Sequence, residues 1–329
     1  NCIFLMYCGR ILMSRVSSGD FILSTTSSPF WRDRIIEEYI VLKQRVISAI
    51  VLIALVFTAL FLFSPYYFAL ALGVVVVLGV WEWTQFFNFK QPTFWRYAIT
   101  GLSAAFLFLW IYGEGNYLDA GRVFELYAQP ILLGAVIWWL VALFFVVTYP
   151  KSSAIWGKHS VLQFFFCFFT LIPFLIGVLL LRLDHYVAAP YHGIMLLLYV
   201  FILVWVADSG PYFVGRKFGK HKLAPKVSPG KSWQGAIGGL VLAGIVAAIF
   251  VNVAQQSLTA NISSEAFIGL SVATVAISIL GDLTESMFKR QSGIKDSSHL
   301  IPGHGGILDR IDSLTAAVPF FAYFYFFVL

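Results

Sequence analysis

Long apolar stretches alternate with shorter polar ones along most of this chain. Nine of the stretches are about 16–22 residues long, the length that lets a helix cross the hydrocarbon core of a bilayer. The alternating pattern of an outer-membrane barrel is absent. We therefore predict an all-α polytopic membrane protein whose nine transmembrane helices are Val46–Phe63, Tyr66–Phe87, Tyr97–Tyr112, Ile131–Tyr149, Val161–Leu181, Tyr191–Ala207, Ala236–Val253, Ile262–Leu280 and Leu314–Leu329.

The distribution of lysine and arginine predicts which side of the membrane each connection faces. With nine helices, 20 of the 22 basic residues fall on one side, and only Arg122 and Arg182 fall on the other. Because basic connections stay in the cytoplasm, we predict a cytoplasmic N-terminus and an external C-terminus.

Composition agrees with this interpretation and limits the alternatives. The 329 residues are 60% hydrophobic and only 12% charged, about half the charge of a soluble domain. The net charge of +6 fits basic loops beside anionic lipid better than a nucleic-acid partner. Cys2, Cys8 and Cys167 are too scattered for a disulfide framework or a zinc site.

The first 40 residues do not fit the pattern of the rest. The apolar run within them is too short to span a bilayer, and no clean small-residue cleavage site follows it. We interpret 1–40 as an extension or a disordered tail without an assigned function, and 41–329 as one transmembrane catalytic domain. Its site is predicted in two cytoplasmic segments, 207–235 and 281–312.

The second of these segments, Gly281–Asp312, lies between two apolar runs and contains five of the sixteen acidic residues. Asp282 and Glu285 are three residues apart, as are Asp309 and Asp312, so each pair shares a face if the segment is helical. PGHGG between the pairs indicates a tight turn. A solvated loop at the membrane edge is the simpler alternative.

The first segment, Ala207–Gly235, is mostly basic. Asp208 ends an apolar helix, where a carboxylate is electrostatically disfavoured. The basic groups that follow are Arg216, Lys217, Lys220, His221, Lys222, Lys226 and Lys231. The sequence SPGKSWQG directly precedes a helix, a context that suits phosphate binding, although Pro225 excludes a P-loop. A positive-inside loop is the alternative interpretation.

Carboxylates and basic groups together suit a reaction between two phosphorylated partners, and the position at the bilayer surface suggests that one partner is a lipid. A further carboxylate, Glu82, lies in VLGVWEWTQFF near the end of the second predicted helix. It is either a functional intramembrane group or a residue that reaches the interface or pairs with a neighbouring helix.

The stretch Ser286–Asp312 resembles the signature of the phosphatidate cytidylyltransferase family, the CDP-diacylglycerol synthases, with the matching residues Ser286, Lys289, Arg290, Lys295, Asp296, Pro302, His304, Gly305, Gly306, Asp309, Arg310 and Asp312. The stretch KHKLAPKVSPGKSWQG resembles a second block of that family. The resemblance runs from about Lys43 to the C-terminus and is closest to the bacterial enzymes.

The resemblance implies a reaction, cofactors and partners. CTP and phosphatidate would give CDP-diacylglycerol and pyrophosphate, with Mg²⁺ and a second cation such as K⁺. The enzyme would be a homodimer in the bacterial inner membrane, among membrane lipids, with its active site on the cytoplasmic side.

The resemblance also implies roles for individual residues. The expected catalytic residues are Asp282, Asp309, Lys289 and Arg290. The expected metal ligands are Asp282, Asp309, Glu285, Asp208 and Asp312. The expected substrate-binding residues are Ser228, Lys231, Lys226, Lys295, His304 and Arg310.

Two other classes of protein remain open from the sequence. In a transporter or channel, Glu82, Asp208 and Asp282 would line an ion path, but the polar groups gather on one side instead of crossing the bilayer. Another lipid-phosphate enzyme, such as a polyprenyl-phosphate sugar-phosphate transferase, would also need carboxylates and Mg²⁺.

Overall fold

A computed structural model describes residues 29–115, 118, 125–210, 219–254 and 262–329. The chain divides into two units, residues 1–44 and 45–329. The candidate site and the contacts that build it lie within residues 45–329. Within the predicted tail, residues 1–28 lie outside the described residues.

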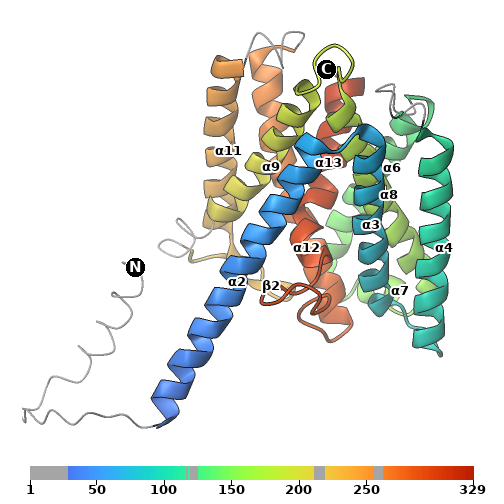
Figure 1. The fold of residues 1–329 in the computed structure, drawn as a ribbon. Helices are drawn as coiled ribbons and strands as arrows, with labels where there is room; N and C mark the ends of the chain where they lie inside the picture. The colour runs from blue at the N-terminus through green and yellow to red at the C-terminus, as the bar shows by residue number, and fades with distance from the viewer. Residues whose placement is uncertain (1–28, 116–117, 119–124, 211–218, 255–261) are drawn as a thin grey trace, which may run out of the picture. The chain divides into compact units, whose positions relative to one another are not determined.

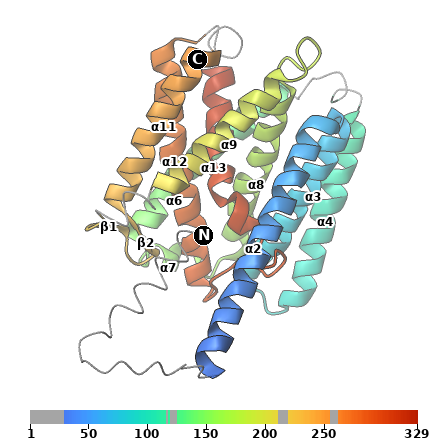
Figure 2. The same cartoon turned by 60° about the vertical axis from the view of Figure 1, so that its left-hand side comes forward.

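Helices account for most of the described backbone (Figures 1 and 2). The long helices are α2 (Pro29–Leu62), α3 (Pro65–Trp83), α4 (Pro92–Gly113), α6 (Glu125–Thr148), α8 (Ser160–Leu183), α9 (His192–Gly210), α11 (Trp233–Ala254), α12 (Ser264–Gln291) and α13 (Leu308–Phe327). Two short helical elements are η1 (Thr84–Phe86) and α7 (Ser153–Trp156).

Seven of the described helices are long and apolar enough to cross a membrane. The apolar part of α9, His192–Asp208, is shorter, and α13 begins with charged residues. The all-α polytopic membrane fold is thereby confirmed, and each predicted span falls on one helix. The number nine and the positions of the two termini stay predictions.

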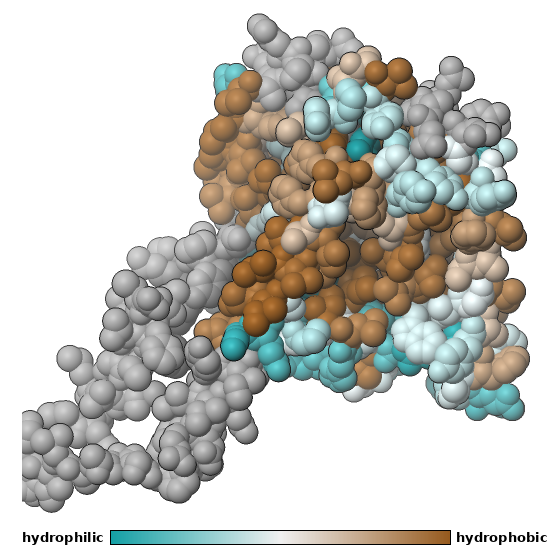
Figure 3. All heavy atoms as spheres, in the orientation of Figure 1, coloured by the Kyte–Doolittle hydropathy of each residue, from teal (hydrophilic) through white to brown (hydrophobic). Residues whose placement is uncertain are grey.

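The outward side chains of these helices are apolar. On α11, for example, Ile237, Val241 and Ile245 are all at least half exposed. Figure 3 shows a hydrophobic band over the middle of the helices, with hydrophilic residues gathered towards both ends of the view. A broad exposed apolar surface of this kind is what a lipid-facing protein requires.

Helices α12 and α13 extend further into the polar segment than predicted. We expected spans at Ile262–Leu280 and Leu314–Leu329, but α12 continues to Gln291 and α13 already begins at Leu308. No helix breaker interrupts α12 before Gly293, whose φ is +70°. The two carboxylate pairs, expected to share a face if the segment is helical, therefore do lie on helices, α12 and α13.

These two helices approach each other closely at Gly281. A Cβ atom there would lie 2.6 Å from the Asp312 carbonyl oxygen and 2.9 Å from the Ala316 Cβ atom. The absence of a side chain thus brings Asp282 on α12 beside Asp312 on α13.

A small hairpin, absent from our predictions, occupies the basic segment. Strands β1 (Lys222–Ala224) and β2 (Ser228–Ser232) pair antiparallel, and α11 begins directly after β2. Ser232 Oγ accepts a hydrogen bond of 3.2 Å from the Gly235 N–H and so caps that helix. The hairpin gives Lys231 a fixed place near the start of α11.

A buried carboxylate on α3 accepts hydrogen bonds from the start of α13. Glu82 is fully buried, and each of its oxygens accepts two hydrogen bonds. Backbone N–H groups donate from Ile307 at 2.9 Å and Leu308 at 2.7 Å. Hydroxyls donate from Ser297 at 2.9 Å and Ser298 at 2.6 Å. The structure thus favours the helix-pairing interpretation of Glu82.

Glu82→Gln should destabilise the protein, because an amide NH₂ cannot accept the hydrogen bonds that one carboxylate oxygen receives. Leaving a buried donor unsatisfied costs about 1–3 kcal/mol. The melting temperature of the detergent-solubilised protein should fall. The control Glu265→Gln, at an exposed position in the first turn of α12, should cost at most about 1 kcal/mol. Equal melting temperatures for both variants would contradict the anchoring role of Glu82.

Gly281→Ala should also lower the melting temperature, because the new methyl group must push α12 and α13 apart. Overpacking of this kind costs about 1–3 kcal/mol. Gly269 on the same helix is the matched control, since a Cβ atom there meets nothing within 4 Å. Gly269→Ala should be neutral or stabilising, because alanine is the better helix former. A tolerated Gly281→Ala would disprove the close approach.

Candidate functional site

A cavity of about 410 Å³ lies where α9, β2, α12, α13 and the connection before α13 meet. Its acidic lining residues are Asp208, Asp282, Asp296, Asp309 and Asp312. Lys231, Lys289 and Arg310 are the basic ones. Five carboxylates facing three cations leave the lining with an excess of negative charge.

Most of the predicted site residues meet at this cavity. The seven that line it are Asp208, Lys231, Asp282, Lys289, Asp309, Arg310 and Asp312. Asp296 also lines the cavity; it was named among the residues that match the family signature but was given no role.

The other predicted residues lie elsewhere. Lys226 and Lys295 are exposed and Ser228 is half-buried on β2. Arg290 donates from Nε to the Val227 carbonyl oxygen at 3.3 Å. None of these four residues, nor His304 or Glu285, is among the cavity-lining residues in the described part of the chain. Arg216 and Lys217 lie outside the described residues.

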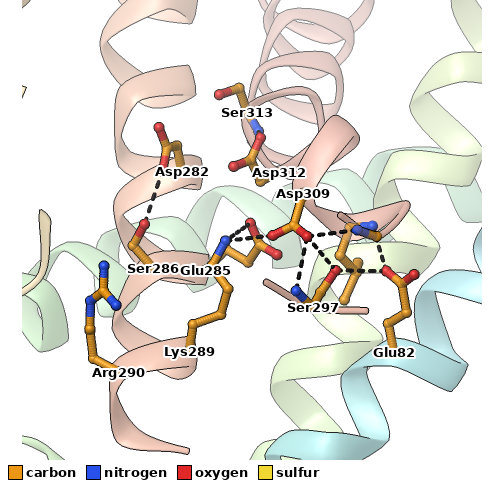
Figure 4. Close-up of polar contacts among 12 residues, drawn as sticks. Glu82, Asp282, Glu285, Ser286, Lys289, Arg290, Ser297, Asp309, Asp312 and Ser313 are labelled. Carbon is orange, nitrogen blue, oxygen red and sulfur yellow. Dashed lines mark hydrogen bonds and ion pairs between the residues drawn. The ribbon is translucent and has the colours of Figure 1, made fainter. Parts of the chain in front are cut away.

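Lys289 links the two helices through a pair of carboxylates. Its Nζ atom lies 2.6 Å from Asp309 Oδ1 on α13 and 3.2 Å from Glu285 Oε2 on its own helix (Figure 4). Glu285 is only 5% exposed, so its charge needs this partner. Lys289 therefore holds the site together besides facing the cavity.

Asp309 organises the turn before α13. Its Oδ2 atom accepts hydrogen bonds from the Gly306 N–H at 2.8 Å, the Ser297 N–H at 2.9 Å and the Ser297 hydroxyl at 3.0 Å. Together with the Lys289 contact, these bonds occupy both carboxylate oxygens. Asp309 thus has a structural role. That it also binds a metal ion stays a prediction.

The glycines of PGHGG are required by this packing. Gly305 has φ +83°, and a Cβ atom there would lie 2.6 Å from Asp309 Oδ2. At Gly306 a Cβ atom would collide with Ser297 Oγ and lie 2.6 Å from both Glu82 carboxylate oxygens. The predicted tight turn is confirmed, and its physical reason is the close approach of these side chains.

His304 belongs to the same turn instead of the cavity lining. Its Nδ1 atom lies 2.7 Å from Ser48 Oγ on α2. Partial burial and the positive charge of Arg310 lower the pKa of His304 below its usual value. A neutral ring is suited to this hydrogen bond, and the arrangement supports a structural role.

Lys231 and Asp282 form an ion pair in the lining of the cavity. Lys231 Nζ lies 2.5 Å from Asp282 Oδ2, and both side chains keep some exposure, 20% and 26%. Ser286 donates to the other oxygen of Asp282 at 3.2 Å (Figure 4). This pair is accessible, so an incoming phosphate can reach Lys231.

The donor set of the cavity fits a hard divalent cation. Asp208, Asp282 and Asp312 come from three helices and face one space, and Mg²⁺ prefers such oxygen ligands. Asp312 also shares a smaller pocket with the buried Glu285. Two carboxylates so placed repel each other unless a cation or a proton lies between them.

Comparisons with known proteins agree with this geometry. The chain matches the cytidylyltransferase family over residues 43–328. It is 67% identical to the phosphatidate cytidylyltransferase of Haemophilus influenzae over 288 residues, which are 88% of this chain and 100% of that protein. It is 44% identical to the phosphatidate cytidylyltransferase of Pseudomonas aeruginosa over 281 residues, 85% of this chain and 96% of that protein.

The family match includes both polar segments and every residue that lines the cavity. The cavity, with its carboxylates and basic side chains between membrane helices, is therefore set within the part of the chain that defines the family. The chain belongs to the cytidylyltransferase family.

Proposed function

We propose that this enzyme transfers the CMP moiety of CTP to phosphatidate, giving CDP-diacylglycerol and pyrophosphate in phospholipid biosynthesis. The observation that carries the proposal is the charged cavity at the ends of membrane helices, where a lipid phosphate and a nucleotide can meet. The names and the extent of the similar proteins support the same reaction.

The reaction needs two highly charged substrates brought together. An oxygen of the phosphatidate phosphate forms a bond to the α-phosphorus of CTP, while the bond from that phosphorus to the bridging oxygen breaks and pyrophosphate leaves. A phosphate monoester is already largely ionised near neutral pH, so no protein base has to remove a proton.

The basic residues of the cavity bind the phosphates in this proposal. Lys231, on the rigid hairpin, and the exposed Arg310 offer charge-assisted hydrogen bonds from two sides. Lys289 is engaged by Asp309 and Glu285, so it sets the local charge and holds its partners.

Asp282, Asp312 and Asp208 are the residues that would hold Mg²⁺, with Glu285 and Asp309 behind them. When bound, the ion neutralises phosphate charge and stabilises charge on the attacking and leaving oxygens. A second, monovalent cation such as K⁺ is part of the proposal.

The proposed setting is the bacterial inner membrane, with the cavity on the cytoplasmic side. The basic side chains on and beside the hairpin, such as Lys222 and Lys226, support this orientation. The protein is a homodimer surrounded by membrane lipids in this proposal.

The direct test is pyrophosphate release by the purified protein in detergent with Mg²⁺, CTP and phosphatidate. Release should require both substrates. Release of a nucleoside monophosphate from a nucleotide sugar with polyprenyl phosphate, without pyrophosphate release from CTP and phosphatidate, would favour the sugar-phosphate transferase. Ion flux in proteoliposomes without any pyrophosphate release would favour the transporter.

Asp282→Asn should lose at least about 100-fold in turnover, the scale seen when charge stabilisation of a transition state is removed. Its melting temperature should change little, because the side chain is partly exposed and makes few contacts. Excess CTP should not restore the rate. Normal turnover at low Mg²⁺ would exclude Asp282 as a ligand.

Asp309→Asn should lose turnover to a similar extent and also melt at a lower temperature, because it breaks the Lys289 ion pair and weakens the turn. The double variant should be little slower than either single one, since both act on one centre. Multiplicative losses in the double variant would contradict a shared centre.

Lys231→Ala should lower catalytic efficiency by about 10- to 150-fold, because a charge-assisted phosphate contact contributes roughly 1.5–3 kcal/mol. Lys226→Ala is the matched control, since Lys226 is exposed on the same hairpin and does not line the cavity. Similar kinetics for both variants would mean that Lys231 only contributes to the positive charge of a cytoplasmic loop.

A further inference from the structure

A second group of ligand-type side chains lies at the other end of α9. Asp184 directly follows α8, and His192 is the first residue of α9. His185 lies between them in sequence, and the three side chains each offer a ligand atom within 4.8 Å of the others. Sixteen residues of α9 separate His192 from Asp208, about 24 Å at the rise of an α-helix. The group is therefore distinct from the charged cavity.

Backbone packing holds the three residues together. Gly193 allows the start of α9 to lie against the end of α8, because a Cβ atom there would collide with the carbonyl oxygens of Leu181 and Arg182. The loop is closed by hydrogen bonds to the His185 carbonyl from the N–H groups of Ala188 at 3.1 Å and Ala189 at 2.8 Å. The arrangement thus exists before any ligand binds.

His185 has an unusual backbone conformation. Its φ is +52°, the only positive value for a residue other than glycine in the described part of the chain. Such a conformation is uncommon and has an energetic cost for residues other than glycine. Its side chain is 65% exposed, so burial of the ring does not offset that cost. The strain instead places the imidazole beside Asp184 and His192.

The distances between the three groups suit a tetrahedral ion. His192 Nε2 lies 3.1 Å from Asp184 Oδ2, and His185 Nε2 lies 3.8 Å from Asp184 Oδ1. Zn²⁺ binds nitrogen and oxygen at about 2.0–2.2 Å, so tetrahedral ligand atoms are roughly 3.4 Å apart. His192 Nε2 is buried and pairs with Asp184 Oδ2. An ion at this site would take the place of the proton between these two atoms.

We propose that Asp184, His185 and His192 form a Zn²⁺ site that clamps the end of α8 to the start of α9. Two imidazoles and one carboxylate favour Zn²⁺ over Mg²⁺, which prefers oxygen ligands alone. Three protein ligands leave a fourth position for water. The guanidinium of Arg182 is turned to other partners, the Leu60 carbonyl oxygen at 2.9 Å and the rings of Phe68 and Tyr186.

The test is binding of Zn²⁺ to the purified, chelator-treated protein in detergent, with excess Mg²⁺ present to occupy the carboxylate cavity. One Zn²⁺ per chain should bind, and it should raise the melting temperature. Co²⁺ used as a probe in its place should give the visible absorption of a tetrahedral ion with nitrogen ligands. Failure of the wild-type protein to bind Zn²⁺ would overturn the proposal and leave only an Asp–His ion pair.

His185→Ala and His192→Ala should each weaken Zn²⁺ binding by at least about 10-fold and abolish the Co²⁺ absorption. His185 is exposed, so its variant tests the site even if the His192 variant misfolds. His159→Ala is the control, because His159 is an exposed histidine at the other end of α8. Equal loss in the control, or unchanged binding in His185→Ala, would contradict the site. Phosphatidate-dependent pyrophosphate release by His185→Ala should be unchanged, which separates this proposal from the transferase.

Discussion

The buried carboxylate of Glu82 is the constraint on which the polar site depends. A fully buried charge is tolerated only when hydrogen bonds replace its water, and Glu82 receives two at each oxygen. Two of its donors are the first backbone N–H groups of α13, which otherwise lack partners at a helix start. Glu82 thereby fixes where α13 begins, and with it the positions of Asp309 and Asp312.

The contacts continue from this anchor to the cavity. Ser297 donates its hydroxyl towards both Glu82 and Asp309, Asp309 pairs with Lys289, and Lys289 pairs with Glu285 (Figure 4). The positive charge of Lys289 between Asp309 and Glu285 lets these carboxylates share a poorly solvated space. Asp282 and Asp208 lie beyond it, and they keep enough freedom to bind a ligand. Asp309 is held by backbone N–H groups, whereas Asp282 pairs with the partly exposed side chain of Lys231, which an incoming ligand can displace.

Much of the fold could be predicted from the sequence, because apolar length and polar interruptions are local properties. The helices and the two polar segments were found in this way, and the family resemblance then implied roles for seven of the cavity residues. The extension of α12 past Leu280 was missed, since hydropathy predicts which residues lie within the bilayer and not the residue at which a helix ends. The partners of Glu82 lie more than 200 residues away, so only the folded chain reveals its role. The close approach of Asp184 and His192 likewise depends on helix packing that no spacing in the sequence indicates.

The most direct measurement of the central claim follows the α-phosphorus of CTP. The purified protein is given phosphatidate and CTP that carries a radioactive phosphorus at the α position, and the products are partitioned between organic solvent and water. The account predicts that the label moves into a lipid soluble in organic solvent, in equal amount to the pyrophosphate released. Label that stays in water-soluble nucleotide while pyrophosphate or phosphate is released would contradict it.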